Sequence, residues 1–192
     1  MTSLILASTS PFRATLLERL QLPFATFAPD IDETPLPDES PEAMVRRLTA
    51  AKAEAARSRF PDRLVIASDQ CAVCDGKILG KPGDHTNAVT QLTSFSGKEV
   101  RFLTGLALLN TQTGNLQLDI VPFGVHFRTL SADQIEHYLA REQPYHCAGS
   151  FKSEGLGITL FKRLEGEDPN ALIGLPLIRL TSFLLNEGVE LP

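Results

Sequence analysis

The chain has 192 residues, 43% hydrophobic and 21% charged, a composition that excludes disordered and fibrous proteins. Its formal net charge of −5 disfavours a general nucleic-acid or membrane-surface binder. The odd count of three cysteines indicates free thiols in a reducing compartment. No apolar run approaches the ~18 residues of a membrane span, and the first residues lack the basic stretch of a secretory signal. We therefore expect a soluble, intracellular protein of the size of an enzyme, which binds neither nucleic acid nor membrane.

Apolar periodicity predicts alternating strands and helices in the first half of the chain. Strands are expected at 4–7, 24–28 and 64–67, and helices at 12–20 and 41–58. Ser10 and Ser40 each precede a proline, the pattern of an N-cap followed by proline at the first helical position. The acidic, proline-bearing segment 29–39 is predicted to be a loop.

The second half shows the same alternation. Asp75-Gly76 indicates a hairpin, and a longer hairpin is expected across Thr113-Gly114-Asn115 between strands 100–109 and 116–127. Further expected elements are helices at 87–95, 131–141 (opened by a Ser131/Gln134 capping box) and 175–186, a polar loop at 143–155 and a strand at 158–164. No repeat or linker interrupts the chain. We predict one mixed α/β domain over residues 1–192, a mixed β-sheet with flanking helices.

The first chemical candidate is the segment Ser8-Thr9-Ser10-Pro11-Phe12-Arg13. Hydroxyls between a strand and a helix N-terminus, with an arginine in the first turn, could bind an anion. An ordinary N-cap with an exposed arginine is the alternative, because such caps are common.

Acidic residues form the second candidate. Asp30, Asp32 and Glu33 could hold a hard divalent cation or orient water, or could simply be solvated. Asp69 follows the apolar strand 64–67, and open α/β sheets place ligands at the carboxyl ends of strands. A turn-forming aspartate is the alternative.

Two lysines complete the candidates. Lys52 lies four residues after Leu48, so it flanks the buried face of its helix, and a snorkelling lysine is the alternative. Lys81 lies in Gly80-Lys81-Pro82-Gly83, a stiff turn that could aim one ammonium or place it on the surface. The segment Lys152-Ser153-Glu154-Gly155 is equally ambiguous.

Rival motifs are weaker. Cys71 and Cys74 have redox or zinc spacing, but an extended chain would put their sulfurs on opposite faces, and no second pair completes a zinc site. His146 beside Cys147 could suggest a thiol dyad, although sequence neighbours usually point apart. The chain lacks a P-loop, a GxGxxG fingerprint and a GxSxG elbow.

Six short motifs occur in one order over nearly the whole chain. They are Leu6-Ala7-Ser8-Thr9-Ser10-Pro11-Phe12-Arg13, Asp32-Glu33-Thr34, Ala51-Lys52-Ala53, Ser68-Asp69-Gln70, Gly80-Lys81-Pro82 and Ala148-Gly149-Ser150-Phe151. Each is weak alone, but the ordered set resembles the Maf family of nucleoside triphosphate pyrophosphatases. Pro11-Phe12-Arg13, Asp69-Gln70 and Phe151-Lys152-Ser153-Glu154-Gly155 resemble the branch that acts on 7-methyl-GTP. The pyrimidine-nucleotide pattern has Arg where Phe12 stands and Thr where Gln70 stands, which puts dTTP and UTP in doubt.

The resemblance implies hydrolysis between the α and β phosphates of a nucleotide, with a divalent cation such as Mg²⁺ or Mn²⁺. It also implies a cytoplasmic location, often a homodimer, and two lobes around a central cleft. It marks Asp69 as proton acceptor, Ser8, Arg13, Glu33, Lys52 and Lys81 as the surrounding catalytic set, and Phe12, Gln70 and Glu154 as specificity positions.

The residues themselves are compatible with that role. Glu33 and Asp69 could share a metal and activate water, while Arg13, Lys52 and Lys81 could neutralise a triphosphate. Pyrophosphatase activity on other nucleotides, a non-enzymatic regulator of cell division and a redox module are the alternatives.

Overall fold

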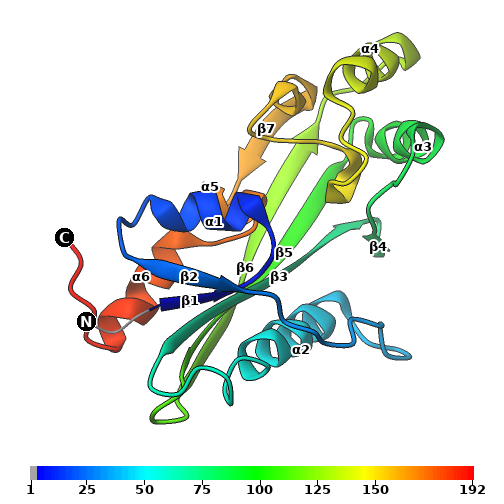
Figure 1. The fold of residues 1–192 in the computed structure, drawn as a ribbon. Coiled ribbons are helices and arrows are strands. Elements are labelled where there is room, and N and C mark those ends of the chain that lie inside the picture. Colours follow the sequence, from blue (N-terminus) through cyan, green and yellow to red (C-terminus); the bar gives the residue numbers. More distant parts are fainter. Residues whose placement is uncertain (1–3) are drawn as a thin grey trace. The chain divides into compact units, whose positions relative to one another are not determined.

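The computed structural model describes residues 4–192 and divides into two compact units (Figure 1). Unit 1 comprises Met1–Gln70, Thr104–Val121 and Asp168–Pro192, and unit 2 comprises Cys71–Leu103 and Pro122–Glu167. The strands form one seven-stranded sheet in the order β2-β1-β3-β5-β6-β7, with β4 paired to β3. The predicted mixed α/β class is confirmed.

The N-terminal elements follow the prediction closely. They are β1 (Leu4–Ala7), α1 (Pro11–Glu18), β2 (Phe24–Phe27) and α2 (Pro41–Glu54). Ser10 and Ser40 cap their helices as predicted, each side chain accepting a hydrogen bond from the backbone three residues on. Helix α2 ends four residues before the expected end, because shorter i→i+3 hydrogen bonds take over at 56–57.

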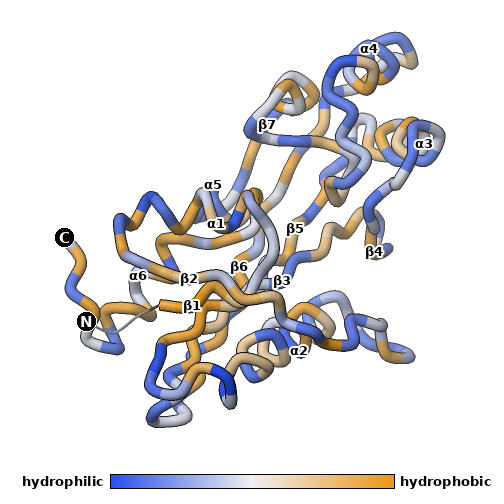
Figure 2. The backbone as a smooth tube through the Cα atoms, in the orientation of Figure 1, coloured by the Kyte–Doolittle hydropathy of each residue, from blue (hydrophilic) through white to orange (hydrophobic). Residues whose placement is uncertain are grey.

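Unit 1 buries both faces of its parallel strands. Strand β1 pairs in parallel with β2 and with β3 (Leu64–Cys74), Leu4 lying opposite Leu64 and Ala7 opposite Ala67. Alternate residues point to opposite faces, so Leu6 joins the core shared with α1 and α6, and Ile5 joins the core on the α2 side. Figure 2 shows the hydrophobic colouring along β1 that this double burial requires.

Helix α2 approaches the sheet very closely at one point. Thr49 is fully buried, and its hydroxyl has no hydrogen-bond partner among the described residues. It lies against Gly105 of β5 (Glu99–Asn110), where a Cβ atom would come within 2.1 Å of that hydroxyl. Only glycine leaves room for the helix at this distance.

Strand β3 is longer than the sequence predicted. The expected strand ended at Ala67, whereas β3 continues through Asp69 and Gln70 to Cys74. The parallel partner β1 does end opposite Ala67, so Asp69 lies just past the carboxyl end of β1 rather than at the end of its own strand. The Asp75-Gly76 hairpin to β4 (Lys77–Leu79) is confirmed.

Unit 2 contains helices α3 and α4 and a cluster of phenylalanine rings in mutual contact. Its elements include α3 (His85–Phe95), α4 (Ala132–Glu142), the 3₁₀ turns Ala148–Ser150 and Leu156–Leu160, and β7 (Phe161–Glu165). The predicted capping box of α4 is present. The strand expected at 158–164 begins only at Phe161, because the chain coils so tightly that a Cβ on Gly157 would lie 2.3 Å from the Lys152 carbonyl oxygen.

Three elements complete the order. Strand β6 (Leu116–Phe127) neighbours β5 across the predicted turn. The helix expected at 175–186 is α6 (Leu177–Asn186). A short helix that the sequence analysis did not predict, α5 (Pro169–Ile173), precedes it and ends at Gly174, whose φ is +124°. Within residues 4–192, no helix is both long enough and apolar enough to cross a membrane.

Candidate active site

The turn between β1 and α1 holds an arginine in a built polar setting. Ser8 is 5% exposed, and its Oγ accepts from the Ser10 backbone N–H at 3.1 Å and from Arg13 Nη1 at 3.4 Å. Arg13 Nε donates to the Gly174 carbonyl oxygen at 2.9 Å. Burial lowers the Arg13 pKa, while the charges of Asp69 and Glu33 raise it. Arg13 is therefore fixed in place and is not an exposed arginine.

Lys52 joins the two carboxylates singled out from the sequence. Its Nζ lies 2.6 Å from Asp69 Oδ1 and 3.0 Å from Glu33 Oε1. The side chains of Lys52 and Asp69 are about one-tenth exposed, whereas that of Glu33 is 57% exposed. The structure thus brings Glu33, Lys52 and Asp69 together. The negative charges of Glu33 and Asp69 also act on the Arg13 guanidinium, whose pKa they raise.

The side chains of Ser68 and Gln70, on either side of Asp69 in β3, point to the opposite face of the sheet from Asp69. Ser68 Oγ donates to the Gly174 carbonyl oxygen at 2.8 Å. Gln70 Nε2 donates to Thr104 Oγ1 at 2.8 Å and to the carbonyl oxygens of residues 171 and 172. A nucleotide base could receive a hydrogen bond from this amide only if it displaced one of those internal acceptors.

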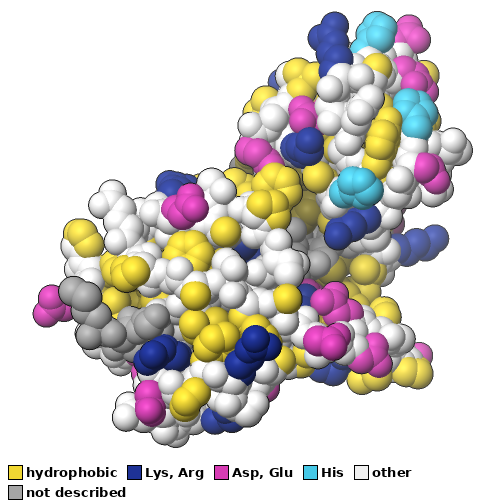
Figure 3. Space-filling model, in the orientation of Figure 1, with side chains coloured by type: hydrophobic (Ala, Val, Ile, Leu, Met, Phe, Trp, Pro, Cys, Tyr) yellow, Lys and Arg dark blue, Asp and Glu magenta, His cyan; other side chains and the backbone are white. Residues whose placement is uncertain are grey.

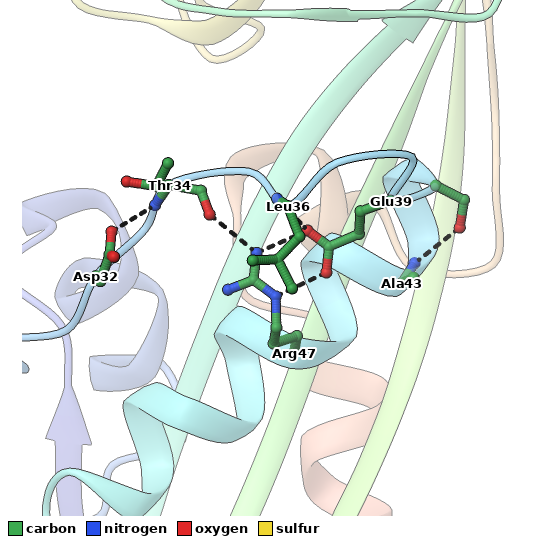
Figure 4. Close-up of polar contacts among 7 residues, drawn as sticks. Asp32, Thr34, Leu36, Glu39, Ala43 and Arg47 are labelled. Atoms are coloured by element: carbon green, nitrogen blue, oxygen red, sulfur yellow. Dashed lines mark hydrogen bonds and ion pairs between the residues drawn. The ribbon is translucent and has the colours of Figure 1, made fainter.

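The acidic loop is anchored to α2 by an arginine that sequence reasoning missed. Arg47 forms a two-pronged contact with the Glu39 carboxylate at 2.7 Å on each prong, and also donates to the Thr34 carbonyl oxygen at 3.2 Å (Figure 4). The hydrogen bond from Arg47 lowers the Glu39 pKa. Figure 3 shows acidic side chains gathered over the segment that precedes α2. Since Thr34 follows Glu33 directly, this clamp restrains the carboxylate that reaches Lys52.

Asp32 and Phe12 have simpler surroundings. Asp32 Oδ1 accepts from the Thr34 backbone N–H at 2.9 Å, and hydrogen bonds from Thr34 lower the Asp32 pKa. Phe12, on the first turn of α1, is 43% exposed, so its ring is available to a planar ligand.

Lys81 and Glu154 belong to unit 2. Lys81 is exposed in the loop between β4 and α3. Glu154 is also exposed, and its segment is tied to α4 by Glu142, which binds the Lys152 ammonium at 3.3 Å and accepts from the Leu156 backbone N–H at 2.8 Å. The loop that carries Glu154 is thus held at both ends.

The cysteines have the surroundings of inert thiols. Cys71 and Cys74 are buried on β3, and Cys147 is half-buried. Burial raises the pKa of the Cys74 and Cys147 thiols, which reduces their thiolate fraction at neutral pH. The redox module therefore loses support.

Asp69 and Glu33 are the two carboxylates that a metal ion could share. In residues 4–192, no group of three or more His, Cys, Asp or Glu side chains is arranged to hold a metal ion. Asp69 and Glu33 both contact one ammonium nitrogen, so their oxygens converge on one point. Mg²⁺ commonly takes one or two carboxylates plus substrate phosphate oxygens. The two carboxylates therefore fit a divalent cation only where a ligand with phosphate oxygens completes its coordination.

Sequence reasoning also missed the turn Asp168–Gly174. Asp168 is 2% exposed and caps α5, and the turn's carbonyl oxygens hold Arg13 and Gln70. The dipeptide Asp168-Pro169 has the pattern of an N-cap followed by proline, which could have predicted the start of α5. The side chains that donate to the carbonyl oxygens of the turn could not be predicted from local sequence, because they lie 67 to 161 positions away.

Comparison with known proteins gives consistent results. The family model described as Maf-like protein matches residues 3–187. The 7-methyl-GTP pyrophosphatase of Pseudomonas aeruginosa is 57% identical over 192 residues, covering all of both chains. The structure of the Staphylococcus aureus Ham1 protein covers 97% of this chain and 100% of its own, with a TM-score of 0.55 and 13% identity, a likeness of fold alone.

Proposed function

This chain belongs to the Maf-like protein family, and we propose that it is a nucleoside triphosphate pyrophosphatase that hydrolyses the α–β phosphate bond of 7-methyl-GTP. The products are the monophosphate and pyrophosphate. One observation carries the proposal: the Asp69 carboxylate is bound by Lys52 and lies within the electrostatic reach of Arg13. The full-length similarity to a 7-methyl-GTP pyrophosphatase supports the choice of substrate.

The chemistry requires a base for water and positive charge for the leaving group. Asp69 is proposed to accept the proton of the water that attacks the α-phosphorus. Arg13 and Lys52 neutralise the charge that develops on the departing pyrophosphate, and Ser8 orients the Arg13 guanidinium. Lys81 is proposed as a further phosphate-binding cation.

Glu33 and Asp69 are proposed to hold Mg²⁺ or Mn²⁺ together with the substrate phosphates. A bound divalent cation would supply charge neutralisation and lower the pKa of water. Within the protein, the Lys52 ammonium forms ion pairs with both carboxylates, and its positive charge offsets the repulsion between them.

Base selectivity is proposed to follow from the charge of 7-methylguanine. Methylation at N7 makes the ring cationic, and the exposed Phe12 ring attracts a cation by about 0.5–2 kcal/mol. Glu154, also exposed, can accept hydrogen bonds from the N–H groups of guanine with charge assistance.

The function is tested with a panel of nucleotides. Pyrophosphate release should be fastest with 7-methyl-GTP, with kcat/KM about tenfold above that for GTP, since 1.4 kcal/mol corresponds to a factor of ten. Glu154→Gln keeps the size of the side chain and removes its charge, so it should reduce this ratio. Equal use of 7-methyl-GTP and GTP would refute the base assignment. Release from no nucleotide would refute the pyrophosphatase and favour a regulator of cell division.

Replacing the two lysines by alanine should separate chemistry from stability. Lys52→Ala leaves Asp69 buried without its partner, so we expect a loss of about 3 kcal/mol in the free energy of unfolding. We also expect a fall of about 10²-fold in kcat/KM, typical of a lost charge-stabilising donor. Lys81→Ala should change stability by less than ~0.5 kcal/mol, because Lys81 is exposed, yet still lower kcat/KM. Urea unfolding and steady-state kinetics measure both, and unchanged kinetics for Lys81→Ala would make it a surface lysine.

Homodimer formation and a cytoplasmic location are likewise proposed, from the family resemblance.

A further inference from the structure

The turn that links β7 to α6 collects side chains from three other elements of unit 1. Its backbone carbonyl oxygens at 171, 172 and 174 accept hydrogen bonds from Arg13 of α1, Ser68 and Gln70 of β3, and Thr104 of β5. The donor–acceptor distances lie between 2.8 and 3.2 Å. A short turn thus serves as acceptor for four side chains.

The turn is itself rigidly closed by a buried carboxylate. Asp168 Oδ1 accepts from the Asn170 backbone N–H at 2.9 Å and from its side-chain amide at 2.8 Å. Asp168 Oδ2 accepts from the Ile178 backbone N–H at 2.7 Å, in the first turn of α6. Because both carboxylate oxygens are engaged, the start and the end of the turn are fixed to each other.

The two β3 residues held by the turn flank the proposed proton acceptor. Successive residues of a strand face opposite sides, so Ser68 and Gln70 reach the turn while Asp69 faces Lys52. The backbone of β3 is therefore held immediately before and after Asp69.

The same turn also directs the phosphate-binding arginine. The Gly174 carbonyl oxygen accepts from Arg13 Nε at 2.9 Å and from Ser68 Oγ at 2.8 Å, so a single atom joins α1 to β3. Two of the three guanidinium nitrogens are directed by protein acceptors, Nε by Gly174 and Nη1 by Ser8.

We propose that the Asp168–Gly174 turn is a positioning element that sets the Arg13 guanidinium in register with the Asp69 carboxylate. This inference rests on the proposed function, which gives those two groups their roles. The turn does not touch the reacting atoms. It acts through Arg13, and Gly174 is its critical position because one carbonyl serves both donors.

Gly174 offers a sharp test with a matched control. Its φ is +124°, and a Cβ there would lie 3.3 Å from Arg13 Nε. Gly188, after α6, also has a positive φ, of +75°, but a Cβ there meets nothing within 4 Å. Both alanine variants carry backbone strain, whereas only Gly174→Ala displaces Arg13. We expect Gly174→Ala to lower kcat/KM for 7-methyl-GTP by about 10- to 100-fold, as small misplacements do, and Gly188→Ala to leave it unchanged.

A double-mutant cycle shows whether the effect passes through Arg13. Arg13→Lys keeps the charge but loses the fork that reaches Gly174 and Ser8. Affinity for inorganic pyrophosphate is measured by calorimetry for each variant, so the readout does not depend on turnover. If Gly174 acts through Arg13, Gly174→Ala should weaken binding in the wild type and have little further effect in Arg13→Lys. Additive losses would overturn the inference.

Two further outcomes keep the proposals apart. If Gly174→Ala does not fold, Ser68→Ala removes the other donor to the same carbonyl and should show the same coupling to Arg13→Lys with a smaller amplitude, additivity again overturning the inference. If the wild type binds pyrophosphate with this coupling but hydrolyses no nucleotide, the positioning role stands and the pyrophosphatase fails. If it hydrolyses 7-methyl-GTP while Gly174→Ala behaves like Gly188→Ala, the pyrophosphatase stands and the positioning role fails.

Discussion

Replacing Asp69 by asparagine is expected to lower kcat for 7-methyl-GTP by about 10²- to 10⁴-fold, the usual cost of losing a general base. Asparagine has nearly the same size and can still accept a hydrogen bond from Lys52, which also keeps Glu33 as partner. The variant should therefore fold, while its amide cannot take a proton from water. Steady-state pyrophosphate release and a circular dichroism melt measure the two properties.

Asp75→Asn provides the matched control for this substitution. Asp75 directly follows β3 and, like Asp69, pairs with a lysine, its Oδ2 lying 2.6 Å from Lys98 Nζ, but this pair is exposed. Its φ is +49°, a conformation that asparagine tolerates as well as aspartate. Turnover should stay near the wild-type rate. A folded Asp69→Asn protein with near-normal turnover would eliminate Asp69 as the base.

Removing divalent cations with excess chelator is expected to lower pyrophosphate release by about three orders of magnitude, since a metal supplies several kcal/mol of charge stabilisation. Activity should return on adding Mg²⁺ or Mn²⁺. Glu33→Gln should raise the Mg²⁺ concentration needed for half-maximal rate and lower the maximal rate, because an amide is a poorer ligand than a carboxylate.

Asp32→Asn distinguishes the two neighbouring acids. Its Oδ1 accepts from the Thr34 backbone N–H, a contact that asparagine preserves, so the loop should keep its shape. The Mg²⁺ dependence of Asp32→Asn should match the wild type. The reverse pattern, with Asp32→Asn impaired and Glu33→Gln normal, would exchange the ligands. Full activity in chelator would remove the metal from the proposal altogether.

Local signals predicted much of unit 1. The Ser10 and Ser40 caps, followed by proline, marked two helix starts to the residue, because capping depends on atoms three positions apart. The continuous apolar run of β1, buried at all four residues, and the Asp75-Gly76 turn of unit 2 are local in the same sense. Such features need no knowledge of the rest of the chain.

The prediction failed where distant partners decide the structure. The polar triplet 68–70 suggested the end of a strand, yet β3 continues because each of these side chains has a distant hydrogen-bond partner. Ser68 donates to the Gly174 carbonyl oxygen, Asp69 accepts from Lys52, and Gln70 donates to the carbonyl oxygen of residue 171. The family resemblance indicated which residues matter without indicating what holds them. No local pattern indicates that Arg47 anchors the acidic loop. The N-cap pattern at Asp168 indicates a helix start but not the hydrogen bond that Asp168 accepts from Ile178.

The contact between Thr49 and Gly105 has a consequence for mutational tolerance. Lys52 lies one helical turn after Thr49, so the depth at which α2 lies on the sheet decides whether the ammonium reaches Asp69. Any side chain at 105 would push the helix outward, since even a Cβ atom meets the Thr49 hydroxyl. In a saturation scan scored by activity, substitutions at position 105 should therefore be as damaging as substitutions of the charged site residues, although Gly105 contributes no functional group. Evolution can vary this position only together with the α2 residues that pack on it.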